Sequence, residues 1–149
     1  MEQRIVMHTC SHKIGNAKYT WNVHHLWELV KDIEPIPMSM DQFDHTFEWQ
    51  MWGDEPLSPR ILLDHYTQTV ECDLHYPIII TLNAWNKVDH IYDGFHRLVK
   101  AKYKEHEKIM VRVIQEEILT QKGNYLEKIE YPCAVCDCNP CDCDWGSYT

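Results

Sequence analysis

The 149-residue sequence predicts a mixed α/β fold, a compact domain in which a small mixed sheet is flanked by helices. Three observations predict it. A continuous apolar run at 77–82, rich in isoleucine, is typical of a buried strand. A short turn follows it, and residues 88–92 return as a hairpin partner. Segments near 22–33 and 95–101, one on each side of this pair, repeat their apolar residues at helical spacing.

The first helix has a start signal and a stop signal. Asn22 can cap it, and Pro35 and Pro37 end it. Its apolar residues recur at i, i+3, i+4 and i+7: Leu26, Leu29, Val30 and Ile33. Alternation of apolar residues over 36–40 then predicts a half-buried strand.

A loop and a second helix are expected before the hairpin. The stretch 41–56 is acidic and rich in tryptophan, and it is predicted to be an irregular loop. Ser58 followed by Pro59 is typical of a helix start. The stripe of this helix comprises Ile61, Leu62, His65, Tyr66 and Thr69.

Another helix and a last strand are expected after the hairpin. Asp93 and Gly94 break the returning strand, and a helix begins at about Phe95. It is expected to bury Phe95, Leu98, Val99 and Ala101. Residues 108–114 alternate as a final strand, whereas 115–130 is ambiguous between helix and strand.

Length, charge and cysteine placement limit the class of protein. We expect one folded domain at 1–130 and a cysteine-rich tail at 131–149. The net charge is −9, which argues against nucleic acid as a partner, because non-specific DNA binding depends on lysine and arginine. No apolar run is long enough for a membrane helix, and the N-terminus lacks the pattern of a secretory signal. We therefore expect an intracellular, cytoplasmic protein with reduced cysteines, whose oligomeric state the sequence leaves open.

The most informative segment is the turn from the second hairpin strand into the helix, Asp93-Gly94-Phe95-His96-Arg97. Glycine allows the backbone to approach a ligand, and the first N–H groups of the helix point toward it. His96 and Arg97 add two side-chain donors, so the turn can bind phosphate. On spacing alone an alternative stays open, in which Asp93 caps the helix and Arg97 pairs with a surface carboxylate.

Two longer segments resemble the ParB/sulfiredoxin-like superfamily. They are Tyr76-Pro77-Ile78-Ile79 and 91–101, Ile-Tyr-Asp-Gly-Phe-His-Arg-Leu-Val-Lys-Ala. The chain is most similar to small stand-alone bacterial proteins with an Asp-Gly-Met-His-Arg signature, which are labelled ParB-like nuclease or partition proteins. Those proteins also carry counterparts of 26–30 and 72–78, and the resemblance covers about 21–114.

The resemblance implies a ParB/sulfiredoxin-like fold and a nucleotide site. Characterised branches hydrolyse CTP, repair an oxidised cysteine with ATP, or phosphorylate free serine. By matching position, Gly94, His96 and Arg97 would bind the phosphates of ATP, ADP or CTP. Asp93 would orient a metal-bound water or an acceptor hydroxyl, with Mg²⁺ as the metal. The partners implied are the nucleotide and a small-molecule or protein acceptor.

Departures from those branches narrow the expected activity to that of a kinase or an NTPase. Phe95 stands where sulfiredoxins carry their reactive cysteine, which argues against sulfiredoxin chemistry. The chain is too short and too acidic for the DNA-binding and dimerisation segments of partition proteins. A kinase-like reaction also needs a carboxylate or an imidazole to take the hydroxyl proton, and His45 and Glu48 are the candidates. The alternative is a non-catalytic regulatory or interaction module.

Two further groups of residues have open roles. The lysines at 100, 102, 104 and 108 could attract an anion, but a solvated helix face explains them better. The tail cysteines are spaced C-x-x-C-x-C-x-x-C-x-C: Cys133, Cys136, Cys138, Cys141 and Cys143. They could bind Zn²⁺, remain mobile thiols or form disulfides. His8, Cys10 and His12 would share one face of a strand and could complete a metal site.

Overall fold

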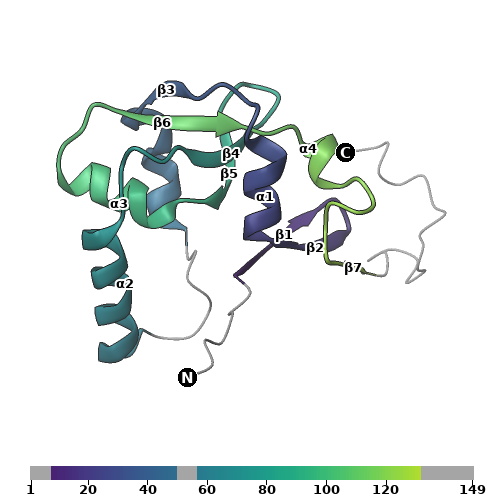
Figure 1. Ribbon diagram of the computed structural model, residues 1–149, viewed down its shortest axis with the longest axis horizontal. Coiled ribbons are helices and arrows are strands. Elements are labelled where there is room, and N and C mark those ends of the chain that lie inside the picture. The colour runs from purple at the N-terminus through teal and green to yellow at the C-terminus, as the bar shows by residue number, and fades with distance from the viewer. Residues whose placement is uncertain (1–7, 50–56, 132–149) are drawn as a thin grey trace. The chain divides into compact units, whose positions relative to one another are not determined.

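The computed structural model describes residues 8–49 and 57–131 and shows a mixed α/β protein (Figure 1). Its described residues divide into two compact units. One unit comprises the residues up to Leu29 together with those from Glu117 onward, and the other comprises Val30–Glu116. Two separate sheets, one of three strands and one of four, account for all the strands described.

The first unit is a three-stranded antiparallel sheet in the order β1-β2-β7, with β1 at Thr9–Ile14, β2 at Ala17–Asn22 and β7 at Glu127–Glu130. One face of β2 is buried through its alternate residues Ala17, Tyr19 and Trp21. The indole N–H of Trp21 donates to the carbonyl of Leu119, 2.9 Å away. This buried bond links β2 to the short helix α4, Glu116–Leu119.

Helix α1, Val23–Val30, follows β2 directly. The Asn22 side chain accepts a hydrogen bond from the backbone N–H of His24 at 2.9 Å, as expected of a cap. The ambiguous stretch 115–130 proves to be partly helix, in α4, and partly strand, in β7. All four residues of β7 are exposed, so no apolar periodicity marks it as a strand.

The second unit contains a four-stranded mixed sheet in the order β3-β6-β4-β5. Its strands are β3 at Ile36–Ser39, β4 at Ile78–Leu82, β5 at Val88–Asp93 and β6 at Lys108–Val113. The β4–β5 pair is the predicted hairpin, β3 is antiparallel to β6, and β4 is parallel to β6. The predicted strands, helix starts and mixed sheet of this unit are confirmed.

The expectation of an irregular loop over 41–56 is wrong for its first half. Residues Met40–Glu48 form a 3-10 helix, η1, while 50–56 lie outside the described residues. Ser39 caps η1 by accepting from the N–H of Asp41, and Phe43 and Thr46 are fully buried. The buried residues of η1, Met40, Phe43 and Thr46, recur every three positions, as the period of a 3-10 helix requires, and their burial stabilises it.

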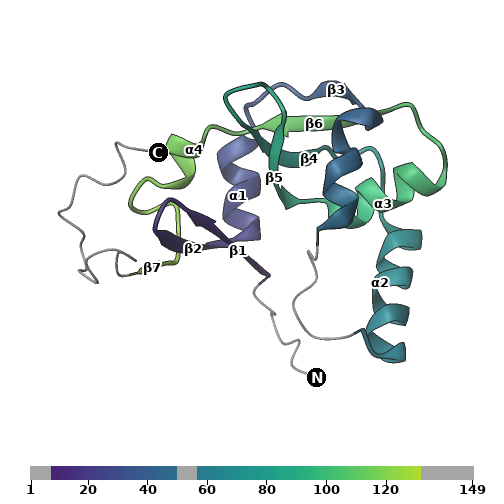
Figure 2. The same ribbon diagram turned by 180° about the vertical axis from the view of Figure 1, so that it is seen from behind.

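Two longer helices complete this unit: α2 at Pro59–Glu71 and α3 at Phe95–Tyr103. Side chains of η1 and α3 join those of the sheet in one core, whose buried members are Met40, Phe43, Ile78, Ile80, Val88, Ile91, Leu98, Ala101, Ile109 and Val111. Helix α2 packs beside α3, and in both views it extends away from the sheet (Figures 1 and 2). No side chain of α2 is buried.

Candidate functional site

The predicted phosphate-binding turn connects the end of β5 to the start of α3. Gly94 lies between them with φ of 103°, in the left-handed region that favours glycine. A Cβ at this position would lie 2.9 Å from Cβ of Ile78 and 2.9 Å from Nη2 of Arg97, and it would overlap Cγ2 of Ile78. The turn therefore needs glycine both for its backbone conformation and for the room that Ile78 and Arg97 leave.

Helix α3 begins directly after this glycine, and no side chain caps it. Its first helical bond runs from the N–H of Leu98 to the carbonyl of Gly94, 3.0 Å apart. The N–H groups of the first turn have no acceptor within the helix, and the helix dipole adds partial positive charge there. Gly94 thus exposes an end of α3 that suits an anion.

Arg97 is held at the turn by the carboxylate that precedes it. Its Nη2 donates to Oδ2 of Asp93 at 2.9 Å, and the two side chains are only 14% and 21% exposed. The same guanidinium packs against Gly94. The sequence left open a capping role for Asp93 and a surface acid as the partner of Arg97. In the structure Gly94 is the cap, and the partner of Arg97 is Asp93 itself.

His96 is paired with a histidine of the neighbouring helix. Nδ1 of His65, on α2, lies 2.9 Å from Nε2 of His96, and the two rings stack with centroids 5.1 Å apart. Burial lowers the pKa of His96 below its usual 6.5, and His65 lowers it further, against the opposing effect of Asp93. His96 is therefore a neutral ring at pH 7, and its hydrogen bond to His65 orients it.

The sequence placed His65 in the stripe of this helix but gave no sign that its partner is His96. One feature of the sequence indicates a contact at this position. His65 shares a face of α2 with Ile61 and Thr69, which are the other half-buried residues of that helix. That face packs toward α3, and a histidine on it is well placed to meet another.

The candidate proton acceptors His45 and Glu48 are on η1. Nε2 of His45 donates to the carbonyl of Val88 at 2.8 Å. Val88 and Asp93 are the first and last residues of β5, about 16 Å apart along an extended strand. His45 is therefore anchored at the opposite end of β5 from the turn. Glu48 is exposed at the end of η1.

Two lysines of α3 make contacts that stabilise the fold. Nζ of Lys100 donates to the carbonyls of Val70 and Cys72, at 2.8 and 2.6 Å, and so satisfies the C-terminal end of α2. Lys102 is exposed, 3.9 Å from a carboxylate oxygen of Asp44. Lys100 therefore contacts α2 and is not part of a solvated face, whereas Lys102 lies on the exposed face that the sequence predicted.

The predicted tail ligands, Cys133 to Cys143, lie outside the described residues. Cys10 and His12 do share one face of β1, as the alternation predicted. Within 8–49 and 57–131, no group of three histidine, cysteine or acidic side chains is arranged to hold a metal ion.

Comparison with protein-family models, with curated protein sequences and with solved structures finds no match to this chain. None of the helices in the described part of the chain combines the length and the apolar character needed to cross a bilayer. The candidate site consequently rests on its own geometry: Gly94 and the start of α3, the Asp93–Arg97 ion pair and the His65–His96 pair.

Proposed function

We propose that the protein binds the phosphate groups of a nucleotide at the Gly94–Arg97 turn and transfers or hydrolyses a phosphoryl group. One observation carries the proposal: the guanidinium of Arg97 folds back on Gly94 at the uncapped start of α3, where Asp93 holds it. Backbone N–H groups, a helix dipole and a fixed guanidinium then converge on one small region. Such a set of donors suits phosphate oxygens.

Each residue of the turn has a distinct part in this proposal. Arg97 donates to the phosphate, and its bond to Asp93 fixes the orientation of its planar group. His96 is neutral and is held by His65. In this proposal its other ring nitrogen contacts the ligand. The resemblance of the sequence to ParB/sulfiredoxin-like proteins supports the same assignment.

Magnesium is the metal that this site would use. Mg²⁺ in nucleotide sites is held by one or two carboxylates together with the substrate phosphates and water, and Asp93 supplies a carboxylate beside the turn. The donor set therefore fits a metal bound mainly by the nucleotide. When bound, Mg²⁺ would neutralise charge on the phosphates.

A second function is favoured by a specific observation. Asp93 is engaged by Arg97, and His45 is anchored at the far end of β5. The turn thus has donors for a ligand, whereas His45, the histidine that the sequence offered as proton acceptor, is held away from it. A regulatory module that binds the nucleotide without turnover is the alternative, and a turnover assay separates the two.

The binding test is thermal stabilisation of the full chain by ATP, ADP, CTP and GTP with Mg²⁺. A ligand present at about 100 times its Kd adds about 2.7 kcal/mol to the free energy of unfolding, a rise in Tm of several degrees. Arg97→Gln should weaken binding about tenfold or more, because it removes a charged donor to phosphate. Lys104→Gln is the matched control, since it removes one exposed positive charge just after the end of the same helix.

Three results would decide the proposal. The absence of a shift with every nucleotide would refute nucleotide binding. A shift that is equal in the Arg97→Gln and Lys104→Gln variants would place the ligand elsewhere. Binding that depends on Arg97, without release or transfer of phosphate, would favour the regulatory module over the enzyme.

A further inference from the structure

The two ring nitrogens of His96 have different surroundings at the start of α3. His96 is the second residue of the helix, so its side chain leaves the main chain within the uncapped first turn. Nε2 is on the far side of the ring from Cβ, and it lies 2.9 Å from Nδ1 of His65 on α2. Nδ1 of His96 is adjacent to the ring carbon that carries Cβ, so it is the nitrogen nearer to the main chain of the first turn.

The hydrogen bond between the rings indicates which nitrogen of His96 is the nucleophile. Burial lowers the pKa of His96, so at pH 7 its neutral ring carries one N–H. One ring donates in this bond and the other accepts. A neutral histidine side chain normally has its hydrogen on Nε2, and both rings keep this form when Nε2–H of His96 donates to Nδ1 of His65. The lone pair of His96 is then on Nδ1.

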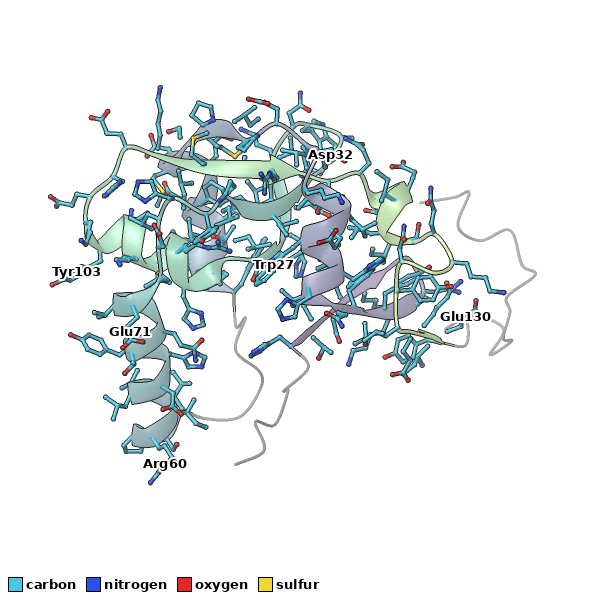
Figure 3. The ribbon with its side chains drawn as sticks, viewed as in Figure 1. Trp27, Asp32, Arg60, Glu71, Tyr103 and Glu130 are labelled. Carbon is cyan, nitrogen blue, oxygen red and sulfur yellow. The ribbon has the colours of Figure 1, made fainter. Side chains whose placement is uncertain are left out.

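A second contact holds α2 against α3 and keeps His65 in place. One turn after His96, Nζ of Lys100 donates to two carbonyls at the end of α2, at 2.8 and 2.6 Å. Figure 3 shows the same end of the helix pair, with Tyr103, the last residue of α3, beyond Glu71, the last residue of α2. Contacts on successive turns of α3 therefore fix the ring of His65, which in turn orients His96.

The first turn of α3 suits a phosphoryl group on Nδ1. Gly94 leaves the first N–H groups of the helix uncapped, and Arg97, the residue after His96, is held at the turn by Asp93. Main-chain donors, the helix dipole and a guanidinium would thus stabilise a phosphate on the ring. In the proposed function the same turn binds the phosphates of the nucleotide, which brings the donor phosphorus close to His96.

A nitrogen nucleophile also removes the need for a base at the first step. Direct transfer to a hydroxyl needs a group that takes the hydroxyl proton, and His45 is anchored at the opposite end of β5. An imidazole nitrogen that already has a lone pair attacks without losing a proton first. The ring then has to lose the proton on Nε2, and Nδ1 of His65 lies 2.9 Å from that nitrogen.

We propose that His96 forms a covalent phosphohistidine, a step that rests on the proposed nucleotide site at Gly94–Arg97. Nδ1 of His96 bonds to the terminal phosphorus of a nucleoside triphosphate while the bond from that phosphorus to the bridging oxygen breaks, and the nucleoside diphosphate leaves. The Nε2 proton passes to Nδ1 of His65. Water or an acceptor hydroxyl then bonds to phosphorus as the N–P bond breaks. The proton returns from His65 to Nε2, and the proton of the attacking oxygen goes to solvent.

The first test detects the intermediate on the full chain. ATP, CTP and GTP, each radiolabelled in the terminal phosphate, are incubated with the protein and Mg²⁺, and the protein is denatured in alkali. We expect bound label that survives alkali and is released by mild acid, since an N–P bond is acid-labile and a phosphoserine ester is not. His96→Gln should lower the label at least about a hundredfold. His106→Gln, at an exposed histidine after α3, should keep it.

The second test separates the role of His65 from nucleotide binding. His65 is a positioning residue here, because it acts through His96. His65→Asn keeps an acceptor oxygen near the position of Nδ1 but cannot take the proton. The shift in Tm with nucleotide should be unchanged, whereas the rate of labelling should fall about a hundredfold at pH 7 and recover as the pH rises. A labelling rate equal to that of wild type would overturn the role of His65.

The third test uses the wild-type chain and does not need the intermediate to accumulate. A nucleotide with a chiral terminal thiophosphate reports how many displacements occur at phosphorus. Two displacements, the first by His96, retain the configuration at phosphorus, whereas one direct transfer inverts it. We expect retention.

The outcomes distinguish this inference from the proposed function. If no nucleotide binds, both are refuted. Binding that depends on Arg97, accompanied by inversion or by neither label nor turnover, would overturn the phosphohistidine and leave nucleotide binding in place. Label that persists in His96→Gln would overturn the assignment to His96, and circular dichroism of that variant shows whether it keeps the fold.

Discussion

Two neighbouring helices of the Val30–Glu116 unit are held in different ways. Helix α3 is the shorter, yet it buries Leu98 and Ala101 in the core and begins at a glycine packed on Ile78. Helix α2 buries no side chain. It is stabilised by Ser58 at its start, by Lys100 of α3 at its end, and by the half-buried face of His65. Helix α3 is thus fixed by the core, whereas α2 is fixed by polar groups at its ends and on one side.

Truncating one leucine in each helix gives the largest expected difference. Leu98→Ala should lower the free energy of unfolding by about 3 kcal/mol, because it leaves a cavity in the core. Leu62→Ala, at an exposed position of α2, should change it by less than about 0.5 kcal/mol. Urea denaturation followed by circular dichroism measures both. Similar losses in the two variants would contradict the difference between the helices.

The start of α3 can be tested through its glycine. Gly94→Ala should cost about 2 kcal/mol or more, since the added methyl overlaps Ile78 and displaces Arg97 in addition to straining the backbone. Gly15→Ala is the control, because Gly15 also has a positive φ but has nothing within 4 Å of the added carbon. It should cost about 1 kcal/mol. Equal costs would mean that the turn readily makes room for a side chain.

The sequence predicted the elements that local interactions stabilise. It missed those that depend on contacts with distant residues. The β4–β5 hairpin and the start of α3 were predictable because a β-branched run, a turn and a glycine are local signals. The helix η1 was not, because packing of Phe43 and Thr46 into the core stabilises it. Strand β7 was ambiguous because its residues are exposed and it pairs with β2, a strand more than 100 residues earlier in the chain.

The same distinction applies to the candidate site. Asp93, Gly94 and Arg97 are neighbours in sequence, so one strand-to-helix turn brings them together. His65 precedes His96 by 31 residues, and it reaches His96 only because α2 packs on α3. No local pattern specifies that packing. The distant half of the site was therefore beyond sequence reasoning, and so was the position of His45 at the other end of β5.

The contact of Lys100 with the end of α2 should have a smaller effect. Lys100→Met removes the donor to the carbonyls of Val70 and Cys72 but keeps the length of the side chain. We expect a loss of about 1 kcal/mol, together with faster amide hydrogen exchange in the last turn of α2 and little change in α3. Lys104→Met, at the exposed residue that follows the same helix, is the control. Unchanged exchange in α2 would show that its end does not depend on α3.

Acidification should produce the smallest change in the free energy of unfolding. It acts through the histidine pair that joins α2 and α3. The pKa of His96 is lowered, first by burial and then by His65, so the unfolded chain binds a proton at this position more readily than the folded one. The contribution of His96 to stability is therefore complete above its ordinary value of 6.5. It is lost as the pH falls from 6.5 through the lower pKa of the folded state.

A series of urea denaturations from pH 7.5 to pH 5 tests this sign. The free energy of unfolding should fall on acidification, and it should fall less in His96→Gln, which cannot take up the proton. His106→Gln, at an exposed position after α3, should retain the wild-type dependence. Protonation of His96 places a cation against the ring of His65. As the pH falls, amide hydrogen exchange, corrected for the intrinsic effect of pH, should therefore become faster in α2 before it does in α3. If the free energy of unfolding depends on pH identically in wild type and in His96→Gln, the histidine pair does not cause the response to acid.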